Sequence, residues 1–77
     1  MTIEDVHAYA WQLMTKASPK INAPNPDAAI YKYWAAHRDF GPPMSNEFAL
    51  DDGTTAQVFA TGRVLHWLGG DSVEEAL

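Results

Sequence analysis

The chain has 77 residues, which is room for one domain with one modest core, and its formal net charge is −5. The absence of cysteine excludes disulfides and thiolate zinc sites, and the lack of any basic run disfavours partners such as nucleic acid and anionic membranes. No stretch of about 20 apolar residues is present, so membrane insertion is not expected.

The first predicted element is an amphipathic helix over residues 3–17. Thr2 followed by Asp5 resembles a helix N-cap with an acid in the first turn. One side of the predicted helix is apolar and carries Ile3, Val6, Ala10, Leu13, Met14 and Ala17. Trp11 lies off the centre of this stripe, and His7 lies beside it one turn earlier. Trp11 is therefore free to meet a ligand or, alternatively, to cover the connector that follows.

A second helix is predicted over residues 26–39, after a proline-containing connector. Asn25 and Pro26 read as an N-cap followed by a proline in the first turn. Helical spacing places one apolar stripe on Ile30, Tyr33, Trp34 and His37. Tyr31 lies off this stripe, and Gly41 is predicted to end the helix as a left-handed C-cap.

Residues 54–68 predict a β-hairpin that turns at Thr61-Gly62, after a turn at residues 51–53. With a two-residue loop, one face carries Ala56, Val58, Leu65 and Trp67, and the other carries Gln57, Phe59, Val64 and His66. A three-residue loop would shift this pairing, and the sequence leaves both registers open.

Ser72 with Glu75 forms a capping-box pattern that predicts a short C-terminal helical stub, ending at Leu77. An isolated hairpin is marginal in water, so it must pack on the two helices. The expected fold class is α+β: a single small domain over residues 1–77, in which two helices pack on a small antiparallel β-hairpin or sheet.

From Asn25 onward the chain resembles the LGFP-type repeat, an accessory domain that accompanies bacterial cell-wall hydrolases and related secreted proteins. The resemblance rests on the helix start at residues 26–34, on the block Gly41-x-Pro43-x-Ser45-x-Glu47, and on Gln57-x-Phe59 followed by Gly62. It implies a non-catalytic role, commonly taken to be attachment to cell-envelope polymers.

The sequence gives little indication of a catalytic site or a metal site. His7, His37 and His66 fall on three different predicted elements without metal-ligand spacing, so no metal or cofactor is expected. Asp51 and Asp52 are adjacent and fit a turn better than a catalytic pair. The chain is therefore not expected to be an enzyme.

The function predicted from the sequence is a non-catalytic binding module for cell-envelope glycan or peptidoglycan. Its expected ligand-binding residues are Trp11, Tyr31, His66, Trp67 and His7. The alternative is a protein–protein interaction or self-association domain, which includes a homodimer. The N-terminus lacks the basic and apolar pattern of a signal peptide, so the expected location is cytoplasmic if the chain is complete and extracellular if it is excised from a longer secreted protein.

Overall fold

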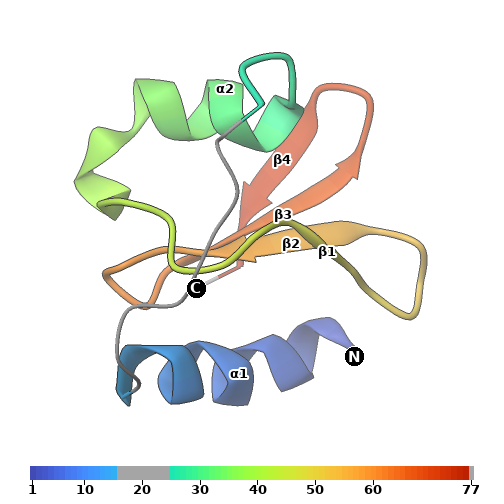
Figure 1. Ribbon diagram of the computed structural model, residues 1–77. Helices are drawn as coiled ribbons and strands as arrows, with labels where there is room; N and C mark the ends of the chain where they lie inside the picture. Colours follow the sequence, from blue (N-terminus) through green and yellow to red (C-terminus); the bar gives the residue numbers. More distant parts are fainter. Residues whose placement is uncertain (16–24, 77) are drawn as a thin grey trace.

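The computed structural model describes residues 1–15 and 25–76, apart from the side chains of His7, Met14 and Thr15. The elements are helix α1 (Ile3–Thr15), helix α2 (Ala29–Ala36), the 3₁₀ turn η1 (Arg38–Phe40), and strands β1 (Phe48–Ala49), β2 (Thr55–Val58), β3 (Val64–Gly69) and β4 (Ser72–Glu75). The strands form one antiparallel sheet in the order β1-β2-β3-β4. Figure 1 shows α1 on one side of this sheet and α2 on the other. The predicted α+β fold of two helices packed on a small antiparallel sheet is confirmed.

Helix α1 begins with a reciprocal cap. The Thr2 amide donates to Asp5 Oδ2 at 3.0 Å, and the Asp5 amide donates to the Thr2 hydroxyl at 3.3 Å. The bond from the Thr2 amide is the main reason that the pKa of the Asp5 carboxyl lies below its ordinary value. The predicted apolar stripe is buried at Val6, Ala10 and Leu13. Residues 16 and 17 of the predicted helix lie outside the described residues.

Helix α2 begins later than predicted, at Ala29 rather than at residue 26. The side chain of Asn25 accepts a hydrogen bond from the Asp27 amide at 3.0 Å, and its carbonyl accepts one from the Ala28 amide at 3.1 Å. Asn25 therefore closes a turn instead of capping the helix directly. Ala28 becomes the N-cap residue, with an extended backbone and no side-chain hydrogen bond.

The predicted second helix also ends early, because α2 stops at Ala36 and His37 separates it from η1. Gly41 then reverses the chain with φ of 76° and ψ of −178°. Its positive φ agrees with the predicted need for glycine, but the extended ψ differs from the predicted left-handed helical cap. Burial of Phe40 beneath this turn, at 1 % exposure, anchors η1 to the sheet.

The predicted hairpin forms, with the register of a three-residue loop. The Phe59 amide donates to the Arg63 carbonyl at 2.9 Å, and Val58 pairs with Val64. Gly62, the third loop residue, has a φ of 79°, as a three-residue hairpin loop requires. The two-residue-loop register is therefore wrong, and the alternative shift of one residue is correct.

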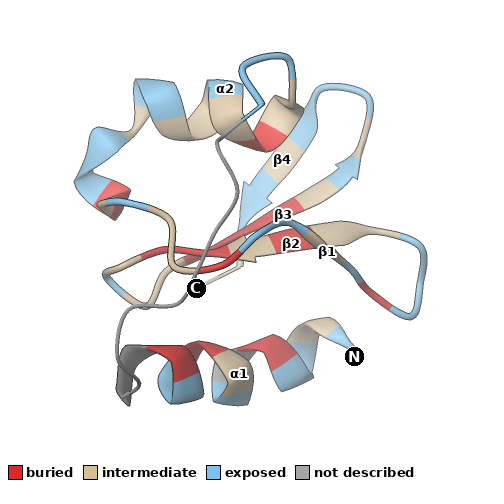
Figure 2. Cartoon of the chain, viewed as in Figure 1, coloured by how far each residue is buried: buried red, intermediate tan, exposed pale blue. Residues whose placement is uncertain are grey.

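This register decides which side chains face each helix. Ala56, Val58 and Val64 join the core cluster beneath α1, whereas Phe59 and Leu65 join the cluster beneath α2. Figure 2 shows the buried stripe of α1 turned toward the sheet and its exposed side turned away. Because both faces of the sheet are covered, the small domain has two thin cores rather than one.

The predicted C-terminal helical stub is wrong, since Ser72–Glu75 is strand β4. The β3–β4 hairpin turns through Gly70-Asp71, with Gly69 paired to Ser72 and a φ of 53° at Gly70. Pairing of Leu65 with Glu75 gives this segment partners that a short helix would lack. Tertiary pairing therefore overrides the local capping pattern.

Across the described segments, neither helix has the length and apolar character that a membrane span requires.

Candidate functional site

The predicted binding residues do not form one surface. Trp11 projects from α1 with 68 % of its surface exposed, whereas Tyr31 is half-buried on α2, across the sheet. Tyr31 lies against Trp34, with the two ring centroids 5.7 Å apart. Because the two helices cover opposite faces of the sheet, the predicted platform of Trp11 and Tyr31 is not formed. The side chain of His7 lies outside the described residues.

His66 was predicted to contribute to a surface site, yet only 4 % of the residue is exposed. Its Nε2 lies 2.6 Å from the Thr54 hydroxyl, and its Nδ1 lies 2.9 Å from Glu74 Oε1. The Thr54 hydroxyl also donates to Asp52 Oδ1 at 2.5 Å. The ring is thus held inside a polar chain that runs from the β1–β2 turn to β4, because the observed register places it directly opposite Glu74.

The polarity of this chain fixes the role of each group. Thr54 has one hydroxyl hydrogen, and the carboxylate of Asp52 can only accept it. His66 Nε2 meets the Thr54 oxygen, and Nδ1 meets the Glu74 carboxylate. The ring thus joins the two ends of the polar chain, and the hydroxyl hydrogen of Thr54 is already directed to Asp52.

A second polar network joins α2, η1 and the β3–β4 hairpin. Glu75 accepts hydrogen bonds from the Tyr33 hydroxyl at 2.7 Å and from Arg63 at 2.5 Å. Arg63 also pairs with Asp39 at 2.9 Å and lies over the Phe40 ring, 4.0 Å from its centroid. The Tyr33 hydroxyl is the main cause of a lowered pKa at Glu75, and the same bond raises the pKa of Tyr33.

These networks predict a loss of stability in acid. The hydroxyl of Thr54 lowers the pKa of Asp52, and that of Tyr33 lowers the pKa of Glu75. Because the unfolded chain then binds these protons more readily than the folded one, stability is expected to fall as the pH drops through about 4. Thermal unfolding followed by circular dichroism across this range measures the effect.

The matched control for this prediction is Asp52→Asn. Asparagine retains a side-chain oxygen that can accept from Thr54 but has no carboxyl to titrate. Its unfolding temperature should be lower than that of the wild type near neutral pH, and the difference should narrow in acid. A constant difference at every pH would contradict the assigned role of the Asp52 carboxyl.

A separate pocket of about 250 Å³ lies where the start of α2 meets the β3–β4 turn. Its lining residues are Asp27, Ala28, Ala29, Lys32, Glu47, Trp67, Gly70 and Asp71. The pocket therefore contains one of the predicted binding residues, Trp67, and combines its indole with four charged side chains. It is a candidate binding site within the part of the chain that the structure describes.

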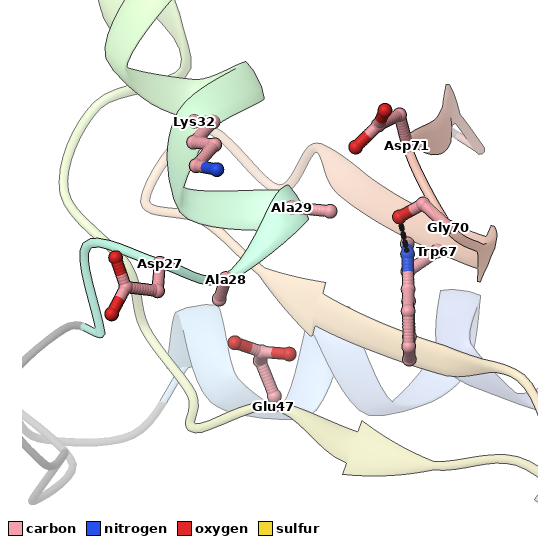
Figure 3. A pocket seen from close by; sticks show the side chains of 8 residues that line it. All are labelled: Asp27, Ala28, Ala29, Lys32, Glu47, Trp67, Gly70 and Asp71. Atoms are coloured by element: carbon pink, nitrogen blue, oxygen red, sulfur yellow. Dashed lines mark hydrogen bonds between the residues drawn. The ribbon is translucent and has the colours of Figure 1, made fainter.

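Trp67 forms one wall of this pocket and is fixed in place. Its Nε1 donates to the Gly70 carbonyl at 2.8 Å, and the residue packs on the core cluster beneath α2. Figure 3 shows the indole nearly edge-on, with one flat face turned toward the start of α2. In Figure 3 the Lys32 ammonium lies beside α2 and the Glu47 carboxylate lies below the start of that helix, whereas the Asp27 carboxylate points away from the indole.

The ligand-binding residues predicted from the sequence include Trp67 but none of the charged residues that line the pocket with it. Asp27 and Lys32 belong to the α2 segment, Glu47 precedes β1, and Asp71 lies in the β3–β4 turn. These residues have no shared spacing in the sequence, because only the packing of α2 on the sheet brings them together. No metal-binding group of three or more His, Cys, Asp or Glu residues occurs within residues 1–15 and 25–76.

Comparison with known proteins assigns no function to this pocket. No family model matches the chain, and neither a curated protein nor a solved structure matches it. The resemblance to LGFP-type repeats therefore stays a prediction from the sequence.

Proposed function

We propose that the protein is a non-catalytic binding module for a polyhydroxylated glycan, and that the pocket beside Trp67 holds one sugar unit. The observation that carries this proposal is the presence of an indole face among charged hydrogen-bonding groups in one pocket. Among polyhydroxylated glycans, the resemblance to LGFP-type repeats favours one of the cell envelope, such as peptidoglycan.

The chemistry of the pocket suits a sugar ring. A sugar presents an apolar face of C–H groups and a rim of hydroxyls, so it matches an aromatic face bordered by polar side chains. The carboxylates of Glu47 and Asp71 can accept hydrogen bonds from hydroxyl groups, and the Lys32 ammonium can donate to hydroxyl oxygens. These roles need no proton transfer.

Preorganisation of the pocket also supports binding. The indole is held by its hydrogen bond to Gly70 and by packing on the core. The opposite wall belongs to α2, which is anchored by Ile30 at 1 % exposure. Little side-chain freedom of Trp67 is therefore lost when a ligand stacks on it.

The arrangement of Thr54, His66 and Glu74 supports a non-catalytic role. It resembles a nucleophile, a base and an acid in composition, but the Thr54 hydroxyl hydrogen is directed to Asp52. The imidazole is also almost fully buried. We therefore assign this chain of contacts to holding β4 and the β1–β2 turn together.

A sedimentation assay with insoluble peptidoglycan tests the proposal. We expect Trp67→Ala to weaken binding by about tenfold or more, the size of effect seen for an aromatic anchor. Trp11→Ala is the matched control, because it removes an exposed indole from α1 on the other side of the sheet. Unchanged binding by Trp67→Ala, with an intact fold by circular dichroism, would overturn the proposed site.

A second candidate function is protein interaction or self-association, favoured by the exposed Trp11. Tryptophan is enriched among residues that dominate protein interfaces. If this candidate is correct, light scattering after size exclusion will show a mass that rises with concentration in the wild type and stays monomeric in Trp11→Ala. A monomeric wild type at every concentration would remove the self-associating version.

A further inference from the structure

We propose that the pocket beside Trp67 selects sugars that carry a protonated amino group over neutral or acidic sugars. This inference rests on the proposed function and specifies its ligand class. It follows from the charge around the pocket, where acidic side chains outnumber the single lysine, Lys32. An amino sugar supplies the apolar ring face, the hydroxyl groups and the positive charge that this combination of side chains matches.

The lining of the pocket includes three acidic residues and one lysine, and two of these acids, Glu47 and Asp71, are the ones whose carboxylates are not turned away from the indole. The ion pairs formed among the described residues use other acids, namely Asp39, Asp51, Glu74 and Glu75. Those pairs therefore leave the negative charge of the pocket in place. The whole chain is also acidic, with a formal charge of −5, which adds to the attraction for a cation.

Two of the acids lie on different sides of the pocket that the indole borders. Figure 3 shows Glu47 and Asp71 on different sides of the pocket, with Trp67 forming the wall between the sheet and the turn. A cation near the face of an indole is itself stabilised by the ring electrons. A sugar stacked on Trp67 would thus place an amino substituent near both the aromatic face and a carboxylate.

Lys32 favours an amino sugar over a cationic peptide. Lys32 lines the pocket, and its ammonium can only donate hydrogen bonds. The hydroxyl oxygens of a sugar can accept these bonds, whereas lysine side chains have no acceptor to offer Lys32. An acidic sugar is disfavoured although Lys32 is positive, because the Glu47 and Asp71 carboxylates would repel it.

Isothermal titration with four tetrasaccharide or peptide probes tests the selection. The probes are a β-linked glucosamine tetramer, its N-acetylated counterpart, a galacturonic acid tetramer and tetralysine, at a mildly acidic pH where the amino groups of the probes are protonated. We expect the glucosamine tetramer to bind about tenfold more tightly than the N-acetylated one, as exposed ion pairs and cation–π contacts allow. Added salt should reduce this ratio.

Two variants test whether Glu47 causes the preference for the glucosamine tetramer. Glu47→Gln should remove most of the preference for the glucosamine tetramer while preserving binding of the N-acetylated tetramer. Glu4→Gln is the matched control, because it removes the same charge from an exposed position on α1, across the sheet. The control should keep the full preference, which separates a local effect from one of net charge.

The outcomes distinguish this inference from the proposed function. Equal affinity for the glucosamine and N-acetylated tetramers would overturn the inference and leave the proposed glycan function standing. Failure of both tetramers to bind would overturn both. Tetralysine binding as tightly as the glucosamine tetramer would show that the pocket recognises charge alone, and the assignment to a sugar would then be wrong.

Discussion

Replacing Phe59 with alanine is expected to lower the free energy of unfolding by about 3–5 kcal/mol, the largest effect of any substitution considered. Phe59 is 1 % exposed and lies between Trp34 and Phe40 in the cluster beneath α2. Its ring stacks near Trp34 at a centroid distance of 6.2 Å and meets Phe40 edge-on at 5.8 Å. Removing it would open a cavity that joins the sheet, α2 and η1.

The size of the protein makes this loss severe. A chain of 77 residues is expected to have a total stability of only about 4–12 kcal/mol. Urea denaturation followed by circular dichroism measures the change, with Leu68→Ala as the control because Leu68 is 49 % exposed. The control should lose less than about 0.5 kcal/mol. A loss below about 1 kcal/mol for Phe59→Ala would contradict the assigned position of the ring in the core.

Replacing His66 with phenylalanine is expected to lower the free energy of unfolding by about 1–3 kcal/mol, since hydrogen bonds to charged groups contribute on this scale. Phenylalanine keeps a ring between β2 and β4 but cannot donate to Thr54 or to Glu74. The connection from the β1–β2 turn through β3 to β4 would be broken. The same urea experiment measures the change.

Glu74→Gln provides the comparison for His66→Phe. Glutamine keeps a side-chain oxygen that can accept from His66 Nδ1 but removes the negative charge opposite the ring. Its loss of stability should be smaller than that of His66→Phe, because the Thr54 bond is retained. Equal or greater stability of His66→Phe relative to the wild type would show that the polar chain does not stabilise the fold.

Local chemistry made much of the fold predictable. The cap formed by Thr2 and Asp5, the buried stripe of α1 and the hairpin at Gly62 all follow from short-range rules, and all are present. The hairpin register did not follow, because a Thr-Gly turn is compatible with loops of two and of three residues. One residue of shift exchanges the two faces of one strand relative to its partner strand.

Errors in the fold arose where distant contacts decide the structure. Ser72 and Glu75 match a capping box, yet β3 offers this segment a strand partner. Asn25 could cap a helix, yet it closes a turn and moves the start of α2 to Ala29. In both places the local pattern is real, but packing on the sheet selects a different conformation.

The candidate site was predictable only in part. Trp67 is among the expected ligand-binding residues, and it does line the pocket. Trp11 and Tyr31 are expected there because each lies off the apolar stripe of its predicted helix, but the sheet separates them. The sequence did not place the acids of the pocket in one site, because Glu47 and Asp71 meet only through the order of the strands.

The most direct test of the glycan pocket is tryptophan fluorescence during titration with solubilised cell-wall glycan. The chain has three tryptophans, so the wild type is compared with Trp67→Phe and Trp11→Phe. A glycan stacked on Trp67 should quench or shift the emission of the wild type and of Trp11→Phe, and leave that of Trp67→Phe unchanged. A response that persists in Trp67→Phe and disappears in Trp11→Phe would contradict the pocket and place the contact on α1.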